Sequence, residues 1–127
     1  MKVSPGFVDY LNDLFAALGP VRVRPMFGGV GVYAGLLMFG FLDRDETIYL
    51  RVDDQTREAF AAAGSAPFRY PLKTGEQMEI GYWRMPEDAL EAPELAADWA
   101  RLALDAALRK KVGKKNRKPP SSPASSG

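Results

Sequence analysis

The sequence contains neither cysteine nor histidine, and these two absences exclude several classes of function. Without cysteine no disulfide bond and no thiolate nucleophile can form, and without either residue the common zinc sites cannot be built. Without histidine there is no Ser-His or Cys-His relay and no imidazole to serve as a general base near neutral pH. We therefore expect a protein that is not an enzyme and that binds no cofactor or metal. An enzymatic alternative would have to use carboxylates, lysine or tyrosine.

Long hydrophobic runs are also missing, so we expect no membrane-spanning helix. The first 15 residues, "MKVSPGFVDYLNDLF", contain one lysine and early acids, unlike the basic-then-apolar pattern of a secretory signal. The expected location is cytoplasmic. A length of 127 residues is typical of one folded domain that can bury a core of its own.

Basic residues are scarce outside one short segment near the end of the chain. This segment, residues 109–118, contains seven of the 17 lysines and arginines and no acid. The other ten basic residues face all 16 acids, which gives the remainder a net charge of −6. We therefore divide the chain into a folded domain at 1–111 and a disordered basic, Pro- and Ser-rich tail at 112–127.

Hydrophobic spacing alternates along the chain between helical and strand periods. It predicts helices over 5–18, from 54 to 63 and from 93 onward, an edge strand at "VRVR", a strand meander over 31–52 and a hairpin over 68–85. The inward stripe of the last helix is predicted at Leu95, Trp99, Leu102 and Leu108. The order α-β-β-β-α-β-β-α predicts an α+β fold, a two-layer sandwich of helices on an antiparallel sheet of about five strands.

Three segments carry a resemblance to a known family: "RPMFGGVGVYAGLLMFGFLDRDETIYLRVDD", "FAAAGSAPFRY" and "GYWRMPEDALEAPELAADWARLALDAA". Over about residues 4–110 the sequence resembles the N-terminal domain of the TfoX/Sxy family, bacterial regulators of natural competence. The resemblance implies a secretion-chaperone-like fold and no catalytic residues. It also implies a transcription-related role, because full-length members are similar to two-domain proteins that act with a cyclic-AMP receptor protein. Here the tail stands where a second domain would begin, so we expect a stand-alone N-terminal domain.

The glycine-rich stretch after the first predicted strand has two interpretations. Gly28 and Gly29 precede strand-like residues rather than a helix, which argues against a dinucleotide-binding loop. They either permit a bulge or close backbone packing, or form an anion-binding nest with Arg22 and Arg24. We favour the structural role and keep the four residues as a candidate anion or partner contact.

Carboxylates crowd the turn "DRDE", residues 43–46, and could hold a hard cation. The turn lacks the length and glycine spacing of a calcium-binding loop, and acids are ordinary at turns. We interpret these residues as solvated turn residues.

Aromatic residues concentrate on the predicted hairpin. Phe68, Tyr70, Tyr82 and Trp83 could stack nucleic-acid bases, but the acidic body disfavours a phosphate backbone unless Arg69 and Arg84 cluster locally. Tyr82 and Trp83 must face opposite sides of a strand, so we expect one of them in the core and the other exposed. We predict a protein-contact surface that includes Phe68, Tyr70 and Trp83.

Two hypotheses for function follow. The first is a non-enzymatic interaction module, a competence-related or transcription-related regulator acting by contact with a protein partner, as a monomer or homodimer. The second is an auxiliary nucleic-acid binder without sequence preference. Its contacts would be Arg109, Lys110, Lys111, Lys114, Lys115, Arg117 and Lys118.

Overall fold

The computed structural model describes residues 5–26 and 29–116, with side chains up to residue 113. Its elements follow in chain order. They are α1 (Pro5–Leu14), η1 (Ala16–Leu18), β1 (Val21–Met26), β2 (Gly29–Ala34), β3 (Leu37–Leu42), β4 (Ile48–Arg51), α2 (Arg57–Ala62), β5 (Pro67–Pro71), β6 (Gln77–Arg84), η2 (Glu87–Ala89) and α3 (Pro93–Asn116).

The strands form one antiparallel sheet with the order β1-β2-β3-β4-β6-β5. The described residues therefore contain six strands rather than about five, and four of them precede α2 rather than three. The first strand forms in spite of Pro25 because β1 is an edge strand, where a residue without an N–H costs little.

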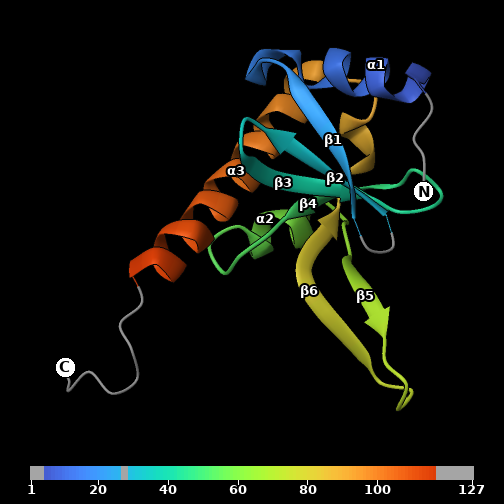
Figure 1. Cartoon of the computed structure of the whole chain (residues 1–127), viewed down its shortest axis with the longest axis vertical. Coiled ribbons are helices and arrows are strands. Elements are labelled where there is room, and N and C mark those ends of the chain that lie inside the picture. The colour runs from blue at the N-terminus through green and yellow to red at the C-terminus, as the bar shows by residue number, and fades with distance from the viewer. Residues whose placement is uncertain (1–4, 27–28, 117–127) are drawn as a thin grey trace.

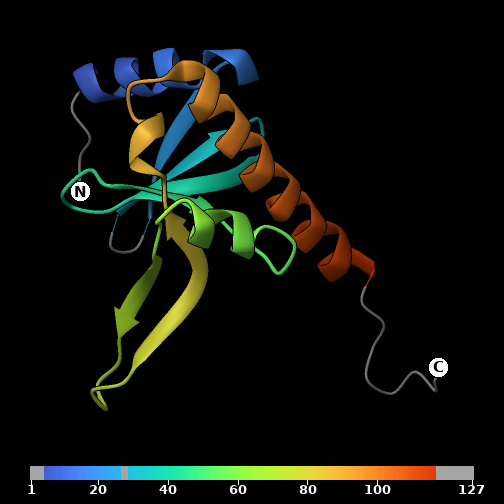
Figure 2. The same ribbon diagram turned by 180° about the vertical axis from the view of Figure 1, so that it is seen from behind.

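Helices cover one face of this sheet. Figure 1 shows the sheet in front of α3 and Figure 2 shows α3 in front of the sheet, with α1 across the top in both views. The helix α3 contacts β3, β4 and α1. The predicted α+β class with two layers is confirmed.

The main core lies between the helices and the sheet. Its largest fully buried side chains are Phe15, Phe39, Phe60, Leu11, Leu42, Leu50, Met85 and Val32. The helix α3 contributes small residues to this core: Ala96, Ala97, Ala100, Ala103, Ala106 and Ala107 are buried.

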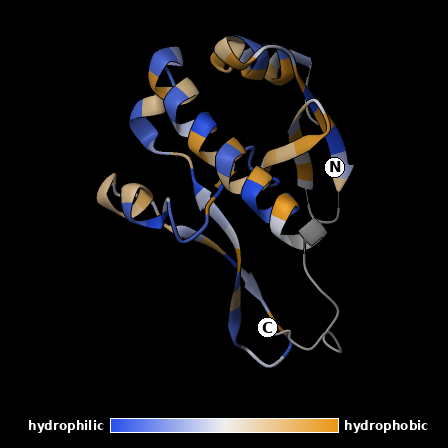
Figure 3. Cartoon of the chain, turned by 90° about the vertical axis from the view of Figure 1, so that its left-hand side faces the viewer, coloured by the Kyte–Doolittle hydropathy of each residue, from blue (hydrophilic) through white to orange (hydrophobic). Residues whose placement is uncertain are grey.

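The predicted inward stripe of α3 is therefore partly wrong. Leu95 and Leu108 are 42% and 50% exposed, while Trp99 and Leu102 are partly buried at the edge of the core. Alanines without long side chains let the helix axis approach the sheet, so the large residues lie beside the contact rather than in it. Figure 3 shows hydrophobic and hydrophilic residues alternating along this helix.

Both terminal helices differ from their predicted bounds. The first helix is divided at Phe15 into α1 and η1, and it stops at Gly19, whose φ of 88° is left-handed. The last helix continues to Asn116, so the boundary predicted after residue 111 falls within α3. The remaining part of the predicted tail, 117–127, lies outside the described residues.

The hairpin β5–β6 extends away from the two layers. Figure 1 shows the hairpin projecting downward, on the side away from α1, with no helix packed beside its tip. Near its base, Gly81 adopts a φ of 83°, and the β5–β6 register shifts between Pro67 and Arg69. Such irregularities increase the local twist and redirect a strand, which accounts for the departure of the hairpin from the plane of the sheet.

Candidate partner-binding surface

A second, smaller core lies on the face of the sheet opposite the helices. Phe41, Tyr49 and Tyr82 are buried there, with Met38 and Phe68 packed against them. Phe41 stacks on Tyr49 with ring centroids 5.0 Å apart, and Phe68 meets both rings edge-on at 5.0 Å. Cross-strand pairs of this kind stabilise a sheet and fix its register. We call these five residues the aromatic cluster.

The aromatic cluster continues along the projecting hairpin as a row of exposed apolar side chains. Tyr70 and Met78 are direct cross-strand partners, and Ile80 follows on the same face as Met78 because side chains alternate along a strand. Their exposed fractions are 40%, 46% and 39%. We call Tyr70, Met78 and Ile80 the hairpin strip. Clustered apolar side chains on a projecting element are typical of interaction sites.

Of the three residues predicted for a partner surface, the structure places Phe68 and Tyr70 together and Trp83 elsewhere. Trp83 packs in the main core with 9% of its surface exposed. Its neighbour Tyr82 points to the opposite face and joins the aromatic cluster. The two residues face opposite sides as predicted, but the expectation that one of them is exposed is wrong, because both are buried. The exposed apolar residues of the hairpin are instead Met78 and Ile80.

Burial also changes the acid–base properties of the cluster. Burial is the main cause of the raised pKa of the Tyr82 phenol, and the nearby guanidinium of Arg51 opposes it. Burial likewise raises the pKa of Tyr49, whose hydroxyl lies 3.3 Å from Asp43 Oδ2. Both phenols therefore stay protonated near neutral pH. The rings stack on one another rather than on the surface, so they form no platform for nucleic-acid bases.

Four arginines occupy the same face of the sheet. The register pairs Arg22 with Tyr33 and Arg51 with Tyr82, and Arg24 and Arg84 follow on the same sides of their strands. In the part of the chain that the structure describes, none of the four has a carboxylate within salt-bridge distance.

The arginines contact carbonyl oxygens and rings instead. Arg51 lies over the ring of Tyr82 at 5.0 Å and donates to the Ile80 carbonyl at 3.2 Å. Arg24 lies 5.7 Å from the centre of the Tyr33 ring. This face therefore carries four arginines that form no salt bridge among the described residues, although the chain outside 109–118 has a net charge of −6. From the sequence we considered a local cluster of Arg69 with Arg84; Arg69 instead pairs with Glu79 at 3.6 Å.

Among the described residues of the predicted anion site, Arg22 does not lie beside Gly29. Arg22 and Gly29 lie at opposite ends of the β1–β2 ladder, and Arg22 donates to the Gly35 carbonyl at 2.9 Å. A Cβ built on Gly29 would be 2.2 Å from the Leu42 carbonyl oxygen, so this glycine permits close packing of β2 on β3. Gly28 lies outside the described residues.

The carboxylates of residues 43–46 organise their own turn. Asp43 Oδ1 accepts hydrogen bonds from the backbone N–H groups of Asp45 at 2.9 Å and Thr47 at 3.0 Å. Among the described residues, no three acidic side chains converge in a way that could hold a metal ion.

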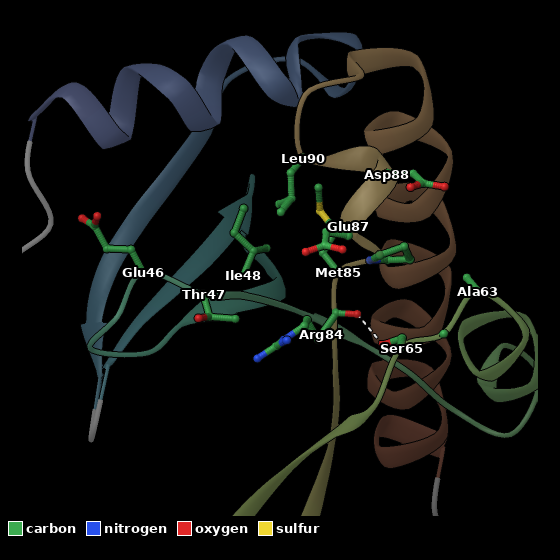
Figure 4. Close-up of a pocket in the computed structure, with 12 residues that line it drawn as sticks. Glu46, Thr47, Ile48, Ala63, Ser65, Arg84, Met85, Glu87, Asp88 and Leu90 are labelled. Carbon is green, nitrogen blue, oxygen red and sulfur yellow. Dashed lines mark hydrogen bonds between the residues drawn. The ribbon is translucent and has the colours of Figure 1, made fainter.

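A pocket of about 600 Å³ opens between the start of β4, the end of α2 and η2. Figure 4 shows Glu46, Arg84, Glu87 and Asp88 among its lining side chains. Ser65 in this lining has a hydroxyl group that donates a hydrogen bond to the Arg84 backbone carbonyl. The residues that line the pocket include no histidine that could act as a general base and activate this serine.

A comparison with known families shows which of these features lie within a known domain. A family model described as the TfoX N-terminal domain matches residues 13–107. The chain belongs to the TfoX N-terminal domain family. No protein with curated annotation matches the chain. The resemblance stated from the sequence is confirmed, and TfoX N-terminal domains are not a known enzyme family.

The part of the chain matched by the TfoX N-terminal domain contains the aromatic cluster, the hairpin strip and the four arginines. The match ends at residue 107, before the basic segment 109–118. Among the described helices, none is long and apolar enough to cross a membrane.

The residues of the basic segment 109–118 lie in different environments. Arg109 Nε and Nη2 donate to Asp53 Oδ2 and Oδ1 at 2.6 and 3.0 Å, which ties α3 to the loop before α2. This hydrogen bond is the main cause of the lowered pKa of Asp53. Arg109 is thus engaged within the fold, whereas it was predicted as a nucleic-acid contact.

The lysines of the segment lie on the last turns of α3. Lys110 and Lys111 are exposed. Lys114 and Lys115 are helical in their backbone. Arg117 and Lys118 lie outside the described residues.

Sequence reasoning missed three residues of this surface, Met78, Ile80 and Arg51. It named Arg22 and Arg24 as candidate anion or partner contacts and considered Arg84 only in a local cluster with Arg69. The available signal for Met78 and Ile80 was their alternation with Glu79 along the strand. For the arginines it was the alternation with valine in β1, while Arg51 and Arg84 are single arginines at the ends of β4 and β6.

Proposed function

We propose that this TfoX N-terminal domain is a non-enzymatic interaction module that takes part in competence-related or transcription-related regulation in the cytoplasm. It acts by binding a protein partner on the hairpin strip and the adjoining face of the sheet. The observation that carries the proposal is the row Tyr70, Met78 and Ile80, each about two-fifths exposed, on a hairpin that projects from the body.

The aromatic cluster supports this surface mechanically. Phe68 joins β5 to the buried rings of Phe41 and Tyr49, so the base of the hairpin is held in a fixed position. A rigid base reduces the conformational entropy lost when a partner binds the strip. Apolar and aromatic residues presented in this way are the kind that dominate binding energy at protein interfaces.

Affinity capture from the native cell, with nuclease treatment, tests the proposal. The test variant Met78→Thr with Ile80→Thr removes apolar surface from the strip while keeping β-propensity. The control variant Leu36→Ser with Val112→Ser removes apolar side chains that are 83% and 46% exposed elsewhere. We expect a protein captured by the wild type and the control to be lost from the test variant.

Equal capture by both variants would refute the role of the strip. Loss of all captured proteins on nuclease treatment would refute direct protein contact. Thermal melts of both variants check that the differences do not come from unfolding.

A second candidate function is auxiliary nucleic-acid binding through the lysines of α3. The observation that favours it is the continuation of α3 to Asn116, which places Lys110, Lys111, Lys114 and Lys115 on a helix that extends beyond the sheet. A helical array of lysines contacts phosphates without sequence preference and with a strong dependence on salt.

A further inference from the structure

The arginines beside the hairpin strip indicate what kind of protein segment the surface fits. Arg51 contacts the carbonyl of Ile80, so a guanidinium lies directly against the base of the strip. Arg84 is exposed on the same face, diagonal to Arg51 across the β4–β6 ladder. Diagonal neighbours across such a ladder are about 7 Å apart, a spacing that two carboxylates of one extended segment can match.

Neither guanidinium takes part in a salt bridge among the described residues, although Arg84 interacts with the Tyr49 hydroxyl. Among the described residues Arg51 and Arg84 have no carboxylate within salt-bridge distance, whereas Arg57 and Arg101 on the helical side pair with Asp54 and Asp98. An exposed guanidinium presents a fork of donors that suits a carboxylate. The strip supplies an apolar contact next to an unpaired positive charge.

We propose that the partner presents an acidic segment with apolar residues, whose apolar side chains cover the hairpin strip and whose carboxylates pair with Arg51 and Arg84. This inference rests on the proposed function and names the chemistry of its partner. A nucleic acid fits the same face less well. The rings of Phe41, Tyr49 and Tyr82 are at least nine-tenths buried and unable to stack on bases, whereas the exposed apolar strip suits apolar side chains of a protein.

The test uses fluorescence anisotropy with the full chain and labelled probes. The first probe is a short fluorescein-labelled peptide of glutamate and leucine. The others are the same peptide with lysine in place of glutamate, the same peptide with serine in place of leucine, and an oligothymidylate. We expect the glutamate–leucine peptide to bind at least about tenfold more tightly than the other probes, with affinity falling as salt rises.

A charge-matched pair of variants locates the site. Arg51→Gln with Arg84→Gln should weaken binding of the glutamate–leucine peptide roughly tenfold, and Arg57→Gln with Arg101→Gln should weaken it less than about twofold. Because Arg51 also covers the Tyr82 ring, Arg84→Glu alone serves as a second variant that leaves that contact in place. It should weaken binding to a similar extent.

Several results would overturn the inference. These are no binding of the glutamate–leucine peptide, equal binding of the lysine–leucine peptide, equal weakening by both pairs of variants, and binding of the oligothymidylate alone. Sedimentation of the protein by itself must also show a monomer at the assay concentration, since a dimer lost on Arg84→Glu would assign the face to a second copy. Capture that depends on Met78 and Ile80 but not on Arg51 and Arg84 would refute the inference and leave the proposed function intact.

Discussion

Replacement of Gly29 by alanine is expected to destabilise the fold strongly, because β2 and β3 approach each other too closely for a side chain. The added Cβ would lie 2.2 Å from the Leu42 carbonyl oxygen, and Cβ atoms essentially never approach other atoms within 3.0 Å. The two strands would have to separate by about 0.8 Å at a backbone contact, where no rotamer change can relieve the overlap. We estimate a loss of about 3 kcal/mol in the free energy of unfolding. For a domain of this size the melting temperature would fall by roughly 10 °C.

Gly31→Ala is the matched control two residues along the same strand. Its Cβ would meet the ends of flexible side chains, Tyr33 Cε1 at 3.0 Å and Met38 Sδ at 3.2 Å, which can move aside. We expect a change within about 1 kcal/mol of the wild type. Urea unfolding followed by far-UV circular dichroism measures both variants. Similar midpoints for the two would show that close backbone approach is not the reason for glycine at position 29, and an anion site there would regain support.

Two further predictions concern charge. Asp53→Asn should lower the melting temperature at neutral pH, with a smaller effect as the pH falls. The reason is that the pKa of Asp53 is lowered in the fold. Its stabilising contribution is therefore present above the ordinary aspartate pKa and is lost as the pH drops through the pKa of the folded state. A difference between wild type and variant that does not change between neutral and strongly acidic pH would refute this role for the ion pair with Arg109. Replacement of Lys110, Lys111, Lys114 and Lys115 by glutamine should weaken binding to duplex DNA and reduce the slope of log affinity against log salt by roughly 3 to 4. An unchanged slope in gel-shift assays over a salt series would exclude these lysines as phosphate contacts.

The sequence predicted the architecture well where hydrophobic spacing and chain breakers agree. The order of helices and antiparallel strands followed from local patterns, and the family resemblance agreed with it. The errors arose where two interpretations have the same local pattern. In α3 both the leucines and the alanines recur at helical spacing, and only the distance between helix and sheet decides which set is buried. The edge strand predicted at "VRVR" is confirmed as β1, and its position at the edge of the sheet makes Pro25 acceptable there.

The candidate surface was harder to predict because it depends on which side of the sheet the helices cover. Alternation shows on which side of β4 Arg51 lies and on which side of β6 Arg84 lies. It does not show that these two sides belong to the same face of the sheet. That follows from the register between β4 and β6, in which Arg51 is opposite Tyr82 and Tyr49 is opposite Arg84. The pairing connects residues about thirty positions apart, on the two sides of α2 and β5. Strand pairing thus brings arginines together on one face of an overall acidic body. For this reason the net charge alone did not indicate the charge of this face of the sheet.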